Sequence, residues 1–261
     1  MLKIYKGTER MKLKDKVAII TGGSAGIGKA IALGMAKEGA NIVITARNEE
    51  RLKIAEQDIK NVGVEVLALK SDISVLSDIK DMVDKTVQKY GKIDILVNNA
   101  GISGAPIPFL EKNEETFDKV VAINQKGVFF CTQFVAREMV KRKYGKIIGI
   151  CSAQARVGVP LSTEYAGTKG AMLAMTRAMA AELSPMGINV NAIACGITTD
   201  TEMIMAANYP EEMIQRIVNV TPLRRTASVK DYIGIAILLS SDEGSFITGQ
   251  TISVDGGVTM P

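Results

Sequence analysis

Tyr165 and Lys169 stand four residues apart in a stretch with a helical pattern, and this spacing can support proton transfer. Residues four apart lie on the same face of a helix. A free tyrosine titrates near about 10, but an adjacent cation favours the phenolate and lowers that pKa. Tyr165 is therefore a candidate general acid/base and Lys169 its activating cation, although many exposed helix faces carry such a pair without any function.

Ser152 adds a hydroxyl that could hydrogen-bond the same substrate oxygen. It follows a predicted strand and precedes Tyr165 by thirteen residues. The carboxyl ends of parallel strands are where open α/β sheets bind their ligands. The chain contains no histidine, which excludes Ser-His triads and His-ligated zinc. Proton transfer must use other side chains, and we expect a site without a metal ion.

Short apolar runs alternate with helical patterns along the chain, which is typical of parallel strands buried on both faces. In one helical stretch Ile27, Ile31 and Met35 recur on one face, and Gly39 follows as a C-terminal cap. The alternation predicts a single α/β domain: a Rossmann-type, doubly wound parallel sheet of about seven strands with helices on both faces. The predicted strands are 17–21, 41–45, 64–69, 93–97, 146–151, 188–193 and 251–254.

Composition and charge narrow the function classes. The 261 residues are 47% hydrophobic and 23% charged, which excludes disordered and fibrous proteins. The net charge is +4, and six of the 32 basic residues lie in Met1–Lys16. The rest of the chain has no basic stripe, so we expect no nucleic-acid partner. Residues 1–12 are predicted to form a charged tail before a domain that spans residues 13–261.

Cysteine content and apolar runs indicate the cellular setting. The three cysteines are too few and too scattered for a disulfide framework, and we expect each to be a small buried side chain. The longest apolar run, Tyr232–Leu239, is far shorter than a membrane span, and no signal-peptide pattern is present. We therefore expect a soluble cytoplasmic protein without a membrane partner.

The first predicted strand leads into a glycine-rich turn, Thr21–Gly28. Gly22 permits a tight turn, Gly26 lets the backbone approach a pyrophosphate, and Gly28 lets the next helix pack closely. The helix N-terminus supplies free N–H groups for an anion. A structural loop could use the same glycines, but the position between the first strand and the first helix favours a dinucleotide site.

The end of the second predicted strand indicates which dinucleotide binds. A dinucleotide fold usually places an acid there for the adenosine ribose, whereas this chain has Ala46-Arg47. A guanidinium can bind a 2′-phosphate, so we expect NADP (NADPH), with NAD the less favoured cofactor. Arg47 could instead be a solvated loop charge, and Glu49 and Glu50 dilute the positive field.

From about Leu13 to Gly257 the sequence resembles the short-chain dehydrogenase/reductase (SDR) family. Besides the glycine-rich turn, the similarity lies in Asp72-Ile73, in Asn98-Asn99-Ala100-Gly101, in Asn124 of Asn-x-x-Gly, and in Ser152 with Tyr165-x3-Lys169. The resemblance implies a catalytic tetrad of Asn124, Ser152, Tyr165 and Lys169. It implies cofactor contacts at Gly22, Ser24, Gly26, Ile27, Gly28, Arg47, Asp72, Ile73, Asn99, Gly101, Tyr165, Lys169, Gly196 and Thr198.

In that family the tyrosine is the general acid/base, and the lysine lowers its pKa and holds the nicotinamide ribose. The serine positions the reacting oxygen, and the asparagine fixes a proton-relay water. Taken singly, each residue also has a structural interpretation: Asn124 could kink its helix, Asp72 could cap one, and the Asn98-Asn99 pair could brace a turn.

The segment after the sixth predicted strand departs from the family pattern. Cys195-Gly196 stands where relatives usually carry Pro-Gly, and Asp200 aligns with the threonine that meets the nicotinamide. A shift of one residue brings Thr199 or Thr201 to that place. The segment Thr201–Met213 holds Met203, Met205, Tyr209 and Met213, a flexible apolar set suited to a lid, although core filling explains these residues equally well.

We therefore expect an NADP-dependent enzyme that transfers a hydride between NADP(H) and a secondary alcohol or ketone of a free small molecule. A 3-oxoacyl-(acyl-carrier-protein) reductase is the alternative. Met186 occupies the place of one cation that docks the acidic carrier in some relatives, whereas Lys143 keeps the other. A non-catalytic dinucleotide sensor is the alternative from another class. The resemblance also implies a homotetramer, and the substrate stays open among ketones, polyols, sugar acids, hydroxysteroids and acyl thioesters.

Overall fold

Seven parallel strands form one sheet, as predicted, and their order is β3-β2-β1-β4-β5-β6-β7. A computed structural model describes residues 11–207 and 209–260 of the chain. The strands are β1 (Val17–Thr21), β2 (Asn41–Ala46), β3 (Val66–Lys70), β4 (Ile95–Asn98), β5 (Gly145–Ser152), β6 (Ile188–Cys195) and β7 (Thr251–Val254). Each differs from its predicted bounds by at most two residues, because runs of β-branched residues have a strong local preference for strands.

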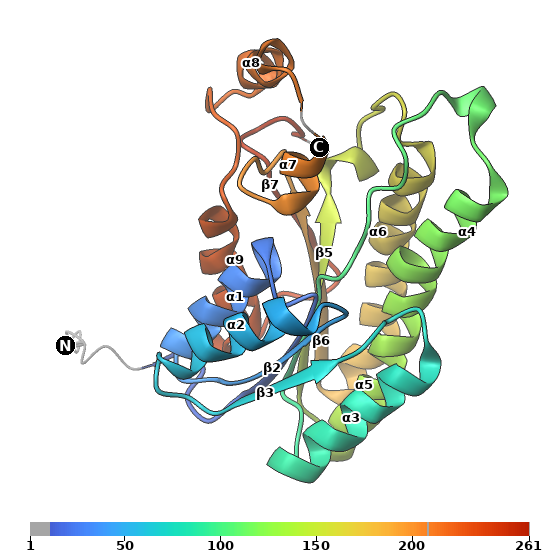
Figure 1. Cartoon of the computed structure of the whole chain (residues 1–261). Helices are drawn as coiled ribbons and strands as arrows, with labels where there is room; N and C mark the ends of the chain where they lie inside the picture. The colour runs from blue at the N-terminus through green and yellow to red at the C-terminus, as the bar shows by residue number, and fades with distance from the viewer. Residues whose placement is uncertain (1–10, 208, 261) are drawn as a thin grey trace.

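Helices cover both faces of the sheet, which confirms the doubly wound fold. In Figure 1, α1, α2 and α9 lie on one side of the sheet and α3, α5 and α6 on the other, while α7 lies beside the upper end of β5 and α8 stands beyond it. The helices are α1 (Gly26–Lys37), α2 (Glu49–Lys60), α3 (Leu76–Tyr90), α4 (Glu114–Val121), α5 (Val128–Arg142), α6 (Thr163–Leu183), α7 (Glu202–Ala207), α8 (Glu211–Val220) and α9 (Ile233–Ser240).

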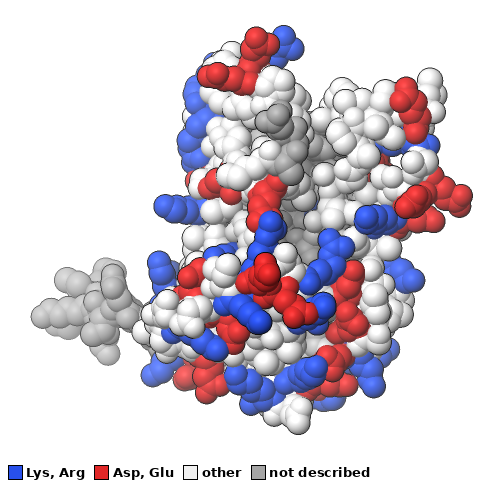
Figure 2. Space-filling view, viewed as in Figure 1, with Lys and Arg blue, Asp and Glu red and all other residues white. Residues whose placement is uncertain are grey.

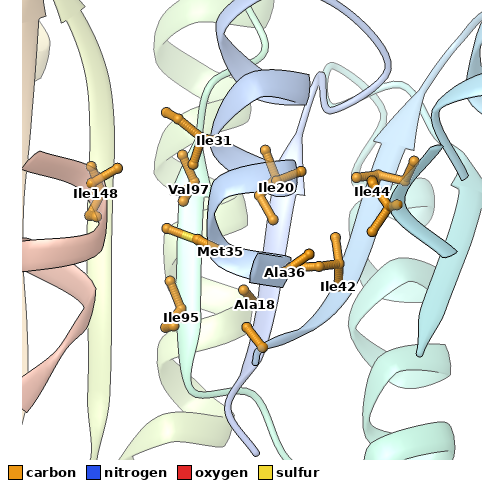
Figure 3. Packing of buried hydrophobic residues seen from close by; sticks show 14 of the residues in the cluster. Ala18, Ile20, Ile31, Met35, Ala36, Ile42, Ile44, Ile95, Val97 and Ile148 are labelled. Atoms are coloured by element: carbon orange, nitrogen blue, oxygen red, sulfur yellow. The ribbon is translucent and has the colours of Figure 1, made fainter. Parts of the chain in front are cut away.

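Successive side chains of a strand pack alternately into the apolar layers on the two faces of the sheet. Ala18 and Ile20 of β1 pack with Ile31 and Met35 of α1 (Figure 3), whereas Ile19, between them in sequence, packs on the opposite face. Successive strand side chains point to opposite faces, so a strand buried on both must be apolar throughout. Burial of one such isoleucine contributes about 1.5–3 kcal/mol. This packing fixes where the strand ends, and therefore the site, lie.

The strand order reverses next to β1, which pairs with β2 on one side and with β4 on the other. The connections leaving β1 and β4 therefore diverge, and they open a crevice at the carboxyl edge of the sheet. This crevice lies next to the glycine-rich turn after β1.

The chain packs against the domain from Met11 onward. The Lys12 N–H donates to the Glu38 carboxylate at 2.9 Å, its Nζ donates to Glu243 at 2.8 Å, and Leu13 is fully buried. The remainder of the predicted tail, residues 1–10, lies outside the described residues. Within residues 11–207 and 209–260, no helix is long and apolar enough to cross a membrane.

Candidate active site

The glycine-rich turn has the backbone geometry that its glycines predict. Gly22 and Gly26 adopt φ values of +66° and +53°, a region that side chains with a Cβ rarely enter. At Gly28 a Cβ would lie 2.5 Å from the Gly22 carbonyl oxygen, so only glycine lets α1 start this close to the turn. Ala25 gives α1 no side-chain cap, and its first turn carries no acid. The turn therefore presents free N–H groups, which suit a pyrophosphate.

Asn99 braces this turn from the neighbouring strand. Its Nδ2 donates to the carbonyl oxygens of Thr21 at 2.9 Å and Gly22 at 3.1 Å. In return, the Thr21 hydroxyl accepts the N–H groups of Asn99 and Ala100 at 3.0 and 3.1 Å. The Asn99 side chain thus joins β4 to the turn after β1, which is the structural role that the sequence left open.

Arg47 and Asp72 meet beside the ends of β2 and β3. Arg47 is 60% exposed, and its guanidinium lies 3.8 Å from the Asp72 carboxylate. The other Asp72 oxygen accepts the N–H and the hydroxyl of Ser74 at 2.9 and 2.7 Å. Burial raises the pKa of Asp72, but the Ser74 hydrogen bonds and Arg47 outweigh burial and lower it. The Glu49 carboxylate pairs with the Lys70 ammonium at 2.6 Å. The exposed Arg47 guanidinium therefore stays accessible to a ligand.

A π-helical turn, Ala122–Gly127, places Asn124 at the back of the site. The Asn124 Oδ1 accepts the Ile102 N–H at 2.9 Å, and its Nδ2 donates to the Ile102 carbonyl at 2.8 Å and to Thr168 at 3.2 Å. Such turns recur at functional sites because they re-aim side chains within a helix. Asn124 is fully buried and joins the connection after β4 to α6.

Lys169 lies behind Tyr165 on α6. Its Nζ donates to the Ile150 carbonyl at 2.7 Å and stands 5.6 Å from the centre of the Tyr165 ring. A Cβ on Gly101 would lie 3.2 Å from the Asn124 Oδ1 and 3.7 Å from the Lys169 Nζ. The structure thus brings together four positions that the sequence assigns to catalysis or cofactor binding.

The pKa of Tyr165 moves in the opposite direction to the one that its spacing predicts. Burial raises the pKa well above that of a free tyrosine, and the neighbouring Ser152 hydroxyl lowers it only in part. Burial also lowers the pKa of Lys169. The loss of water around the phenol is the largest cause of the raised pKa of Tyr165. Tyr165 is therefore held in its protonated form, which can donate a proton.

A cavity of about 350 Å³ begins at Ser152 and continues under α8. Gly196 and Ile197, just after β6, contribute to its wall, as do Tyr209 and Met213 of the predicted lid. The other two lid residues singled out in the sequence, Met203 and Met205, do not line it. Ser152 thus lies in the wall of a space large enough for a small molecule.

The segment after β6 clarifies which threonine faces the glycine-rich turn. The Asp200 carboxylate accepts the Ser228 hydroxyl at 2.8 Å and the Val229 N–H at 3.0 Å. Thr201 packs its methyl group against Gly26, 3.6 Å from where a Cβ would stand. Of these two positions, Thr201 lies at the turn and Asp200 binds the loop before α9.

Cys195 packs as expected. It is buried in the core, and burial raises the pKa of its thiol to about 12. A thiol with so high a pKa is a poor nucleophile. Cys131 and Cys151 are also buried and free, so all three cysteines behave as small apolar side chains.

A buried ion pair that no local sequence pattern predicts joins Lys112 and Glu164. The Lys112 Nζ lies 2.7 Å from the Glu164 carboxylate, and their side chains are only 13% and 3% exposed. Lys112 also donates to the carbonyls of Ala105 at 2.6 Å and Leu161 at 2.9 Å. One ammonium therefore joins the connection after β4, the loop before α6, and the residue next to Tyr165. The two residues lie 52 positions apart, so no local sequence pattern could have predicted their contact.

Comparisons with known proteins agree with this geometry. The short chain dehydrogenase family model matches residues 16–212. A 3-oxoacyl-[acyl-carrier-protein] reductase of Thermotoga maritima is 36% identical over 250 residues, which cover 96% of this chain and all of the relative.

Solved structures are similar to this one over nearly the whole chain. A gluconate 5-dehydrogenase from Burkholderia cenocepacia, in complex with NADP and tartrate, has a TM-score of 0.90 and 36% identity, with 96% and 97% of the chains covered. An NAD+-bound xylitol dehydrogenase has a TM-score of 0.91 and 32% identity, with 94% and 100% covered. The chain belongs to the short-chain dehydrogenase family, and it is an oxidoreductase with that family's Rossmann fold.

Proposed function

We propose that this protein transfers a hydride between NADP(H) and the carbonyl carbon of a free ketone or its secondary alcohol. The observation that carries the proposal is that Ser152, which lines the cavity, neighbours Tyr165, whose ring centre lies 5.6 Å from the Lys169 ammonium. A carbonyl oxygen placed there would face two hydroxyl groups, one of them held in its protonated form. Lys169 and Asn124 stand directly behind them.

The chain's residues divide the work as follows. The nicotinamide, when bound, supplies or accepts the hydride. Ser152 orients the carbonyl oxygen by a hydrogen bond, and Tyr165 donates its proton to that oxygen during reduction and takes it back during oxidation. Lys169 stabilises the phenolate that remains and holds the ribose. Asn124 anchors the backbone at Ile102 and positions a water that connects the site with solvent.

The adenosine end favours NADP over NAD. Arg47 follows β2 directly, is mostly exposed, and has no acid before it that could bind the ribose hydroxyls. A guanidinium forms strong charge-assisted bonds with a phosphate. Asp72 lies close enough to keep Arg47 oriented toward the adenosine site.

Reduction of a carrier-linked 3-oxoacyl group is the second candidate, because curated relatives at about 36% identity carry that name. Lys143 is exposed at the end of α5, and the backbone at Gly187 packs directly against it. Met186, the neighbouring docking position, is apolar, which weakens the attraction for an acidic carrier. We also propose a homotetramer, which the exposed Phe129 on α5 supports.

A substrate panel tests the proposed function. We expect NADPH oxidation with free ketones and NADP+ reduction with the matching secondary alcohols, each at higher kcat/KM than with NADH or NAD+. A 3-oxoacyl group linked to acyl carrier protein serves as the competing arm. If the carrier-linked group exceeds the same acyl group on a short thiol by more than about tenfold, which is about 1.4 kcal/mol of carrier contact, the second candidate is correct. Absence of turnover with every substrate would favour the non-catalytic sensor.

Replacing Lys112 by methionine is expected to lower kcat about tenfold and to lower Tm, because Glu164 is left as an unpaired buried charge beside Tyr165. Removal of one partner of a buried ion pair typically costs about 3–5 kcal/mol. The double variant Lys112→Met with Glu164→Gln should recover most of the lost Tm, because no unpaired charge stays buried. It should not recover kcat, because no side chain then joins the connection after β4 to the start of α6.

The control for Lys112 is Lys85→Met, which breaks an exposed ion pair on α3. It should change neither quantity measurably. Thermal unfolding and steady-state kinetics at saturating cofactor are the measurements. Full activity of the Lys112→Met variant at a temperature where it is folded would contradict a positioning role for the ion pair.

A further inference from the structure

The cavity beside Ser152 has walls from several parts of the chain. Among them are the loop after β5, the segment after β6, helix α8 with the residues that flank it, and the segment that follows β7. Its volume of about 350 Å³ lies at the lower end of the range for small-molecule sites. Figure 2 shows that mostly uncharged side chains border the hollow at the upper end of the molecule, while Lys, Arg, Asp and Glu crowd its lower half.

Helix α8 turns one apolar stripe toward this cavity. Met213, Ile217 and Val220 are spaced four and three residues apart, so they share one face of the helix, and all three line the cavity. The described core does not use this stripe, since α8 has no fully buried residue and Val220 is 71% exposed. The stripe is therefore free to lose its contact with water when a ligand enters.

The facing wall is also apolar. Val157 and Val159 come from the loop after β5 and Val258 from the segment after β7, and each is more than a third exposed. Among the described residues, both faces of the cavity thus offer hydrocarbon to whatever lies between them. Apolar surface of this kind favours a ligand that it can cover.

The charged groups in the wall are already paired within the chain. Arg225 binds both carboxylate oxygens of Asp231, at 2.6 and 2.8 Å. Asp255 accepts the N–H groups of Gly257 and Thr259, each at 3.0 Å, and the Thr259 hydroxyl at 2.5 Å. Among the described residues that line the cavity, no cation is left without an acidic partner to hold a carboxylate or a phosphate.

We propose that this cavity selects apolar substrates: ketones and secondary alcohols whose hydrocarbon chain runs from the Ser152–Tyr165 hydroxyl pair along the apolar stripe of α8. The inference rests on the proposed function and narrows its substrate class. A sugar acid would bury its carboxylate here although the only cation among the described lining residues is already paired, and a polyol would bury hydroxyls against the hydrocarbon of both walls, which is costly. A chain of methylene groups, by contrast, gains binding free energy from each contact with these walls.

A series of 2-ketones of increasing chain length tests the inference on the full-length protein. Each buried methylene contributes about 0.8 kcal/mol, so kcat/KM should rise roughly fourfold per added carbon until the cavity is full. For polar ketoses and keto acids of equal carbon number, kcat/KM should be at least a hundredfold lower than for the best ketone. If these polar substrates are turned over equally well, the substrate class is wrong while the proposed hydride transfer stands.

A measurement of binding tests the inference without depending on turnover. Calorimetry with 2-alkanols in the presence of NADP+ should give the same chain-length dependence in Kd and a negative heat-capacity change. A Kd that does not change with chain length would overturn the inference even for an active enzyme. If the alkanols show the expected dependence but no ketone is turned over, the failure lies in the proposed function.

Two matched variants of α8 test whether the apolar stripe causes the gain in kcat/KM per added carbon. Ile217→Gln puts an amide in the cavity and should reduce the gain per carbon to less than twofold. Ile214→Gln makes the same change on a residue of α8 that does not line the cavity, and should keep the fourfold gain. An equal gain in both variants would show that the chain does not lie along α8.

Discussion

Replacement of Tyr165 by phenylalanine should lower kcat by roughly a hundredfold to ten-thousandfold, the range typical of a lost general acid/base. The variant keeps the ring beside the Lys169 ammonium and loses only the hydroxyl that donates the proton. Cofactor affinity and Tm should therefore stay close to those of the wild type. Steady-state kinetics of ketone reduction, with NADPH binding measured separately, gives both quantities.

The matched control is Tyr90→Phe, which removes a phenolic hydroxyl from α3 and should leave kcat unchanged. The pH profile gives a second readout for Tyr165. Burial raises its pKa, so reduction, which needs the protonated phenol, should not decline until the pH approaches that raised pKa. Alcohol oxidation needs the phenolate and should rise with pH, and the variant should lack this rise. Activity within a few-fold of the wild type would show that Tyr165 is not the acid.

The double variant Ala46→Asp with Arg47→Ile should shift the ratio of catalytic efficiencies toward NAD by at least about a hundredfold. A charge-assisted phosphate contact worth roughly 1.5–3 kcal/mol is lost. The new carboxylate repels a 2′-phosphate and can accept hydrogen bonds from the ribose hydroxyls. Asp72, no longer paired with Arg47, adds to the repulsion.

Kinetics with all four cofactor forms measure the shift. The single variant Arg47→Ile separates the loss of the cation from the gain of the acid. Lys53→Ile removes an exposed cation from α2 and should leave the ratio unchanged. The preference of the wild type should be moderate, because the Asp72 carboxylate, 3.8 Å from the Arg47 guanidinium, offsets part of its positive charge. A wild-type preference for NAD would show that Arg47 is only a surface charge.

The sequence by itself determined the layered fold and most of the residues that meet at the site. The strand runs contain consecutive apolar residues, such as Val17–Ile20, and this pattern predicts strands covered on both faces, as Ile19 and Ile20 are. The φ values of Gly22 and Gly26 followed from their spacing between a strand and a helix. Parallel strands bring their carboxyl ends to one edge, so the loops after β4, β5 and β6 had to converge.

The tertiary structure decided what depends on contacts between distant segments. The pKa of Tyr165 rises because the fold removes water from the phenol, and helix spacing alone contains no information on desolvation. The Lys112–Glu164 ion pair joins the connection after β4 to the first turn of α6, and neither segment has a sequence pattern that predicts this contact. The apolar cavity exists because α8 stands away from the core and keeps its stripe uncovered. A helical pattern shows which face is apolar, but only packing decides whether that face meets protein or a substrate.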